Sequence, residues 1–413
     1  MGVHGHLPRW IKRLARNEIE FMNEKLGAWW WHRQGLDGSL RGASPAEVLQ
    51  ASGWARSVGG ASPYLGIRAR AGATREQVDA AVADCAIHEL PSVRGCTYVV
   101  PSSDFGLALR AAQAVPDGDL AAARKLGVTD RELDLLAGRV LELLPGGPLE
   151  PEAIKQAAGP AVRHLGDAGR KKGLTTTLPL VLARLQVEGR IRRLPTNGRL
   201  DQQRYRYVLW EPSPTAHDER TPEDVARELA VRFFDWAAPA TLGEFRAFSG
   251  LGARAAQAAV ASLDLQPVPD LEGYLSPGNL LPQFGRFTIP TRPQYVLVGS
   301  LDAMILLRSR SSILRFSDAK NAQSFAGNGG LTELPSHAIL DRGRLVGLWE
   351  FDPDAGEVIW MTFARPDAGL RQTVKETETW IRAELGDVRS FSLDSPGSRK
   401  PRLAALREGR IPE

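Results

Sequence analysis

The order of apolar and polar positions predicts the same series of elements three times along the chain. The series is clearest in the middle, where Leu133, Leu136, Val140 and Leu144 recur at helical spacing within a helix over Thr129–Leu144. Shorter helices follow at Leu149–Gly159 and Thr177–Glu188. Arg190–Trp210 then has two β-capable arms around Asn197-Gly198, a strong hairpin-turn signal. Three helices and a hairpin are the elements of a winged helix-turn-helix unit.

The flanking segments repeat this order. Upstream, a helix is predicted over Asn23–Gly35, others begin at Ser44 and Thr74, and Ile87–Pro101 forms a hairpin. Downstream, helices begin at Thr221 and Thr241 and a third spans Ala253–Leu263. The hairpin arms there are Leu265–Val268 and Gly273–Leu275.

The last third of the chain changes character. Tyr295–Phe316, Ala338–Phe351 and Val358–Phe363 are β-rich, a helix is predicted over Leu370–Leu385, and a basic tail follows. We therefore expect an α+β protein of tandem winged helix-turn-helix units followed by a β-rich C-terminal domain. The expected boundaries are 1–115, 116–211, 212–280 and 281–413, with the basic hairpin in the second unit.

Composition narrows the class of protein. The 413 residues are 43% hydrophobic and 24% charged, which is typical of a globular chain. There is no apolar run of membrane-spanning length, and the two cysteines, Cys85 and Cys96, are too few for a disulfide scaffold. The seven histidines show no His-x-x-x-His spacing on a predicted helix, and no phosphate-binding glycine loop occurs. We expect a cytoplasmic monomer without a metal, a cofactor or a membrane partner.

The charge distribution points to a polyanion. The chain carries a net +4, yet Pro160–Trp210 alone holds eleven basic and three acidic residues, which leaves the rest of the chain negative. Such a concentration is an electrostatic footprint for nucleic acid. A solvated charged face would give the same concentration, and a GC-rich genome would by itself favour arginine over lysine. Arginines on a wing contact the DNA backbone, and a helix N-terminus accepts a phosphate. The candidate DNA-binding residues are Arg56, Arg94, Arg170, Lys171, Lys172, Thr175, Thr176, Arg192, Arg193, Arg199, Arg204 and Arg206. The three tryptophans at 29–31 offer a surface for stacking bases, but at least one must face the core.

Several segments, taken in order, resemble the AlkZ/YcaQ family of winged-helix bacterial proteins, which includes DNA glycosylases. They are WHRQGL at 31–36, SPAEVLQASGW at 44–54, SPYLGIRAR at 62–70, RGCTYVVP at 94–101, GLTTTLPLVLARLQVEGRIRR at 173–193, QQRYRYVLW at 202–210, LDAMILLRSR at 301–310 and DRGRLVGLWEF at 341–351. The resemblance implies tandem winged helices around a DNA channel and duplex DNA, possibly damaged, as the partner. Asp302 and Arg308 also fall at family-matching positions, where we expect a buried ion pair.

The chain departs from the family at the catalytic positions. Relatives carry Gln-x-Gln or Gln-x-Asp after the helix formed by SPAEVLQASG, where polar groups orient a water at the sugar carbon. Here the two positions fall on Trp54 and Arg56, or on Arg56 and Val58, depending on a one-residue gap. The hairpin position that holds His in relatives is Tyr98. Arginine stays protonated and cannot act as a base.

The sequence therefore favours a DNA-binding protein of repair or lesion recognition that lacks the catalytic pair of its family. Two alternatives remain open: an active glycosylase with a substituted active site that excises alkylated or crosslinked bases, and a transcription regulator or interaction scaffold.

Overall fold

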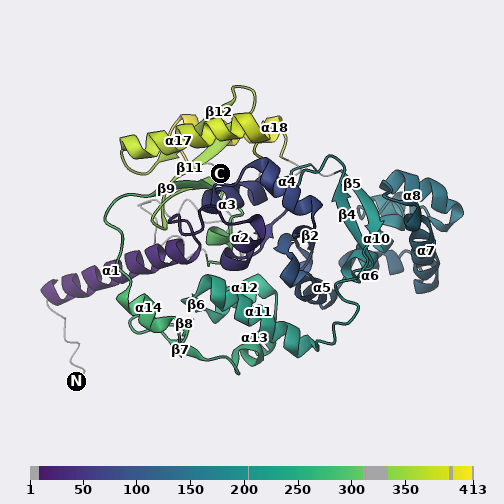
Figure 1. The fold of residues 1–413 in the computed structure, drawn as a ribbon, viewed down its shortest axis with the longest axis horizontal. Helices are drawn as coiled ribbons and strands as arrows, with labels where there is room; N and C mark the ends of the chain where they lie inside the picture. The colour runs from purple at the N-terminus through teal and green to yellow at the C-terminus, as the bar shows by residue number, and fades with distance from the viewer. Residues whose placement is uncertain (1–8, 203, 310–311, 313–333, 390–393, 412–413) are drawn as a thin grey trace, which may run out of the picture.

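The computed structural model describes residues 9–202, 204–309, 312, 334–389 and 394–411, with side chains described from Glu20 onward. The fold is mixed α+β: helices predominate, and the strands of the described ranges form four small antiparallel sheets (Figure 1). No helix in these ranges is both long and apolar enough to cross a membrane.

The first part of the chain consists of a long helix, several shorter helices and a three-stranded sheet. After α1 (Arg9–Arg33) come α2 (Pro45–Ser52), β1 (Ala55–Arg56), α3 (Ser62–Ala71), α4 (Arg75–Ala83), β2 (Ile87–Pro91), β3 (Thr97–Pro101) and α5 (Phe105–Gln113). The sheet order is β1-β3-β2. The predicted helix starts are confirmed, because Ser44 and Thr74 each form a capping box with the residue three positions later. The sequence pattern missed β1 and α3.

The second part repeats this plan with a two-stranded sheet. Its elements are α6 (Gly118–Arg124), α7 (Asp130–Leu143), α8 (Pro151–Ala158), α9 (Gly166–Arg170), α10 (Leu178–Val187), β4 (Ile191–Pro195) and β5 (Tyr205–Leu209). A single bridge from Leu149 to Tyr207 stands where β1 stands in the first part. The hairpin exists, but Asn197-Gly198 is not a two-residue turn, since residues 196–204 all lie between the two strands. The longer loop carries Leu200 into a core formed by other parts of the chain.

The third part has the same order again. It consists of α11 (Pro222–Ala237), β6 (Ala240–Thr241), α12 (Leu242–Ser249), α13 (Ala253–Val260), β7 (Leu265–Pro267) and β8 (Tyr274–Pro277), followed by α14 (Leu281–Arg286). The sheet order β6-β8-β7 matches β1-β3-β2. All three parts therefore share a helix, a short strand or bridge, two or three further helices, and a hairpin whose second strand pairs with that short strand or bridge.

The C-terminal part is a four-stranded sheet of order β12-β11-β10-β9 with helices against it. Its elements are β9 (Tyr295–Val298), α15 (Ala303–Leu306), β10 (His337–Asp341), β11 (Arg344–Asp352), β12 (Glu357–Thr362), α17 (Ala368–Trp380), a π-helical turn (Ile381–Leu385) and α18 (Pro396–Arg407). The expected strand over Tyr295–Phe316 is wrong at α15, where Asp302 caps a helix, and residues 313–316 lie outside the described residues.

The basic tail is not a free arm. Most of it forms α18, whose arginines are paired with the sheet and with a neighbouring turn. Arg399 binds Asp387, Arg402 bridges Glu350 and Asp394, and Arg407 binds Asp352. The tail's charge is largely used inside the protein.

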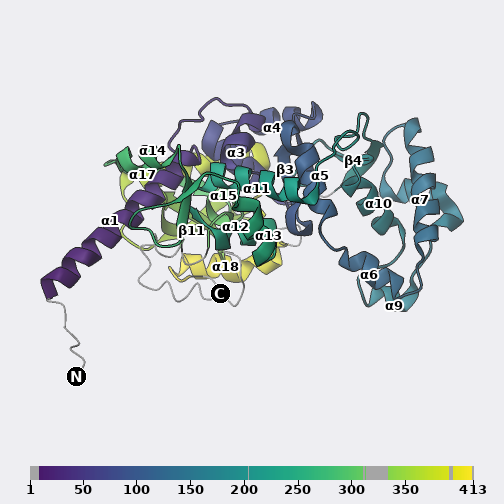
Figure 2. The same ribbon diagram turned by 90° about the horizontal axis from the view of Figure 1, so that it is seen from below.

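The hydrophobic cores show which parts are fused. One core lies wholly within residues 123–191, in the second part. The other three cores each join distant segments, for example α2, α3 and α4 with β9, β11 and α17. The first, third and C-terminal parts therefore form one body, and the second part projects from one end of it (Figure 2).

Candidate nucleic-acid interface

A pocket lies at the positions that the sequence resemblance marks as catalytic. Helix α2 ends at Gly53, whose φ of 106° favours glycine and turns the chain into β1. Strand β1 pairs with β3, so that Arg56 stands opposite Tyr98. The pocket, about 50 Å³ in volume, is lined by Trp54, Arg56, Arg94, Tyr98, Phe248, Leu301, Ala303, Leu306 and Leu307. Val58 is not part of this lining.

Two guanidinium groups reach this pocket from different elements. Arg56 Nη1 donates to the Thr97 carbonyl at 3.3 Å, and its guanidinium carbon lies 5.3 Å from the centre of the Tyr98 ring. Arg94 has a positive φ of 59° in the turn between β2 and β3. Its Nη1 donates to the Ala247 carbonyl at 2.8 Å, near the end of α12. Neither arginine forms an ion pair with any residue that the structure describes.

The pocket has no group that can activate water as a base. No carboxylate, carboxamide or imidazole belongs to its lining. Burial raises the pKa of the Tyr98 phenol, so this hydroxyl stays protonated at neutral pH. Trp54 points its indole nitrogen away, donating to Asp104 at 2.8 Å, and Asp104 is itself paired with Arg232. Two arginines in this lining give the pocket the charge to bind an anion.

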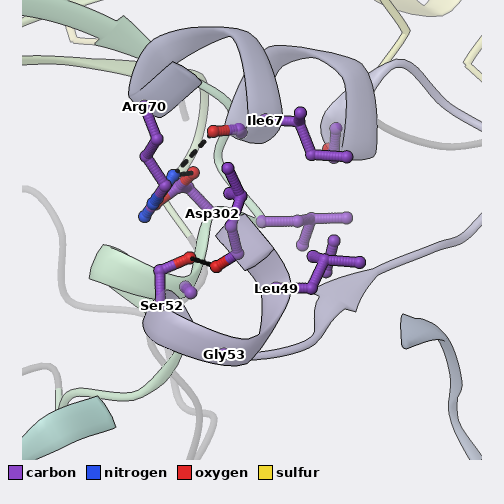
Figure 3. A pocket seen from close by; sticks show the side chains of 12 residues that line it. Leu49, Ser52, Gly53, Ile67, Arg70 and Asp302 are labelled. Carbon is purple, nitrogen blue, oxygen red and sulfur yellow. Dashed lines mark hydrogen bonds and ion pairs between the residues drawn. The ribbon is translucent and has the colours of Figure 1, made fainter. Parts of the chain in front are cut away.

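A second cavity beside this pocket contains the family-matching Asp302. Figure 3 shows Arg70 and Asp302 side by side at one edge of the cavity and the apolar Leu49 and Ile67 across from them. Asp302 accepts two hydrogen bonds from Arg70, both at 2.8 Å, and each side chain is only 2% exposed. Asp302 is thus in a buried ion pair, but its partner is not Arg308. Arg308 lies 3.7 Å from the centre of the Trp30 ring and donates to the Ala237 carbonyl at 2.5 Å.

Much of the charge of the basic segment is neutralised by folding. Five of its eleven basic residues form ion pairs: Arg163 with Glu132, Arg170 with Asp167, Arg184 with Asp134 and Glu188, Arg193 with Glu89, and Arg199 with Asp201. Three of these acids, Glu89, Glu132 and Asp134, lie outside Pro160–Trp210 in sequence. Within the described residues, Lys171, Lys172, Arg190, Arg192, Arg204 and Arg206 form no ion pair.

The wing of the second part faces the body of the protein. Arg193 approaches Glu89 of β2 to 2.9 Å and lies over the Tyr205 ring at 4.4 Å. Glu89 is 3% exposed and also accepts a short hydrogen bond from Ser57. At the tip of the loop, Arg199 donates to the Leu385 carbonyl at 3.0 Å. Arg193 and Arg199 therefore hold the second part against the body, and this use competes with any contact to DNA.

Other candidate residues are open to solvent. Arg170, Lys171, Lys172 and Thr175 are exposed in the stretch that leads into α10, and Arg204 is exposed beside β5. Arg192 and Arg206 are half-buried on the hairpin. Thr176 is buried, so only Thr175 of the two threonines presents its side chain to the surface.

The tryptophan cluster is core. Trp29, Trp30 and Trp31 are each at most 3% exposed, and the first two donate to the Ala238 and Pro239 carbonyls. They do not offer a surface for stacking bases. Across the described ranges, no group of three or more His, Cys, Asp or Glu side chains is arranged to hold a metal ion.

Sequence reasoning missed the residues that distant parts of the chain contribute to the site. Phe248 and Leu307 wall the pocket, and Glu89 with Ser57 anchors the wing. A lone acid in the apolar strand Ile87–Pro91 was the one available signal for Glu89, since buried carboxylates are rarely left unpaired.

Two comparisons with known proteins found matches to this chain. The model of the family described as "DNA glycosylase AlkZ-like" matches residues 47–391. Among solved structures, the Streptomyces sahachiroi DNA glycosylase AlkZ is similar, with a TM-score of 0.64 and 18% identity over 94% of this chain and 97% of that one. No curated protein matches the sequence. Because the family model covers most of the chain, the protein belongs to the AlkZ-like DNA glycosylase family.

Proposed function

We propose that this protein binds duplex DNA through tandem winged helices, in DNA repair or lesion recognition, and does not excise bases. The observation that carries the proposal is the lining of the pocket at Trp54, Arg56 and Tyr98, which lacks any base or carboxamide. A glycosylase must stabilise positive charge that develops on the sugar, and two arginines in that position oppose it.

The repeated topology supports the winged-helix assignment. In each of the three parts, the hairpin's second strand pairs with a short strand or bridge that lies two or three helices before the hairpin. In the second part, α10 is the last helix before the hairpin, the position of the helix that enters the major groove in such proteins. A groove runs along it, lined by Lys155, Thr175, Pro179, Ala183 and Gln186 among others.

The unpaired cations around α10 supply the attraction for the phosphate backbone. Lys171 and Lys172 precede the helix, and Arg204 lies at the end of the hairpin loop. Phosphate contacts of this kind fix a protein on DNA without reading its sequence. We assign backbone contacts to Arg170, Lys171, Lys172, Thr175 and Arg204, with Arg192 and Arg206 at the margin, and place the protein in the cytoplasm as a monomer.

Incubation with alkylated duplex DNA tests the proposal directly. The natural protein is expected to bind the duplex and to leave no abasic sites after strand-cleavage treatment. Arg56→Gln alone is expected to remain inactive, because the family signature needs two polar groups; Trp54→Gln combined with Arg56→Gln asks whether excision returns. Rapid base release by the natural protein would establish the active glycosylase instead. Tight binding confined to one palindromic site would favour a regulator.

A further inference from the structure

The arginine pair in the pocket leaves most of its hydrogen-bonding capacity unused. A guanidinium group has five N–H donors. Arg56 uses one, toward Thr97, at the long distance of 3.3 Å. Arg94 uses one toward Ala247 and has a weak contact of 3.7 Å to the sulfur of Cys96. Among the residues that the structure describes, neither guanidinium has another hydrogen bond or an ion pair, so the remaining donors and both charges are left for a ligand.

The size of the pocket selects a small group. Its volume of about 50 Å³ has room for roughly three to five water molecules. That space admits a tetrahedral anion. Phe248, Leu306 and Leu307 add apolar side chains to the lining, and a charge held beside apolar groups is screened less than in open water.

The charge and enclosure of the pocket select one kind of phosphate. A phosphate monoester, like a phosphorylated side chain, carries a charge of about −1.5 to −2 at neutral pH. Two arginines match this charge better than the single charge of a phosphodiester. The pocket is also largely enclosed, whereas a phosphodiester continues on both sides and needs an open groove.

We propose that Arg56 and Arg94 form a binding pocket for a phosphate monoester, the group that ends a broken DNA strand. The inference rests on the proposed function, since the phosphate is delivered by bound DNA. Recognition of a strand end differs from base excision. It gives Arg56 a function at a position where relatives carry a catalytic residue.

Nicked duplexes that differ only at the nick provide the test. One carries a 5′-phosphate, one a 3′-phosphate and one only hydroxyl groups; the intact duplex is the fourth probe, and inorganic phosphate is the fifth. The natural protein is expected to bind one phosphorylated nick about tenfold more tightly than the hydroxyl nick, the effect of one charge-assisted hydrogen bond. Inorganic phosphate should compete with that preference, and acetate should not.

Substitutions identify the pocket as the source of the preference. Arg56→Gln and Arg94→Gln should each abolish it, and Arg56→Lys should restore part of it. Arg254→Gln is the matched control, because Arg254 is exposed and lies outside the pocket lining, and it should keep the full preference. The urea midpoint of Arg94→Gln is measured alongside, since Arg94 also ties to α12; Arg56→Gln tests the proposal independently of that contact.

The outcomes separate the two proposals. Equal affinity for phosphorylated and hydroxyl nicks, or a preference that survives Arg56→Gln, overturns the pocket assignment while DNA binding stands. A loss of affinity for the intact duplex in Arg56→Gln, without any end preference, likewise overturns it in favour of an internal phosphodiester. Failure to bind any of the duplexes would remove the proposed function itself.

Discussion

Replacing Asp302 with Asn should destabilise the protein severely without touching the DNA-facing surface. All five N–H donors of Arg70 are used: two bind Asp302, one binds the Gly66 carbonyl, and two bind the backbone and side-chain oxygens of Gln34. Asp302 is the one negative charge among these partners. The neutral carboxamide of the Asp302→Asn variant would leave the guanidinium charge buried and uncompensated.

The magnitude follows from the burial of the pair. Both side chains are 2% exposed, and removing one partner of a buried ion pair costs about 3–5 kcal/mol. That is a large share of the roughly 5–15 kcal/mol by which folded proteins are stable. The matched control is Glu408→Gln, which breaks the pair between Arg410 and Glu408, where the side chains are 63% and 58% exposed. The control should change the free energy of unfolding by less than about 1 kcal/mol.

Urea denaturation followed by tryptophan fluorescence measures both changes. A free energy of unfolding for Asp302→Asn within about 1 kcal/mol of the natural protein would refute the reasoning, because the pair could then not be the buried, compensated contact described. The double variant Arg70→Met with Asp302→Leu adds a second check. It removes both charges together and should recover much of the lost stability, as apolar replacement of buried ion pairs often does.

Three further predictions concern the second part of the chain and its contact with the body. Substituting Lys171 and Lys172 with Ala should leave stability within about 0.5 kcal/mol and make the slope of log affinity against log salt shallower by about 0.9 per lost phosphate contact; an unchanged slope in a salt titration would argue against this surface. Arg193→Ala should instead cost about 3–5 kcal/mol in urea unfolding, because it strands the buried carboxylate of Glu89, and a loss confined to DNA affinity would contradict that role. His88 is fully buried, and burial, with the nearby charges of Arg192 and Arg193, lowers its pKa to about 3. The unfolded chain takes up a proton near pH 6.5 and the folded chain does not, so stability falls as pH drops from 6.5 toward 3, by about 2 kcal/mol at pH 5. The His88→Leu variant should lack this loss of stability. If the free energies of unfolding of the two proteins fall in parallel between pH 7 and pH 5, His88 is not the cause.

Local chemistry in the sequence determined where five of the helices begin. Ser44, Thr74, Thr129, Thr221 and Thr241 begin helices because their hydroxyl groups accept hydrogen bonds from backbone N–H groups of the first turn, an interaction that needs only neighbouring residues. The β-prone stretches on either side of turn residues likewise predicted the hairpins. The departure from the family was also visible in the sequence, because segment 44–54 resembles the family and the positions that follow it hold Arg56 and Val58 without a carboxylate or carboxamide.

Tertiary structure alone decided what the charges do. The density of basic residues predicted that Arg193 and Arg199 contact DNA. In the structure, Arg193 pairs with Glu89 of the first part, and Arg199 pairs with Asp201 in the loop that lies against the body. Arg70, rather than Arg308, is the partner of Asp302, across a sequence separation of 232 residues. Short strands such as β1 are too brief to carry a periodic signal and form only when β3 offers a ladder. An ion pair or a pocket depends on which distant surfaces meet, and composition and periodicity describe only neighbours along the chain.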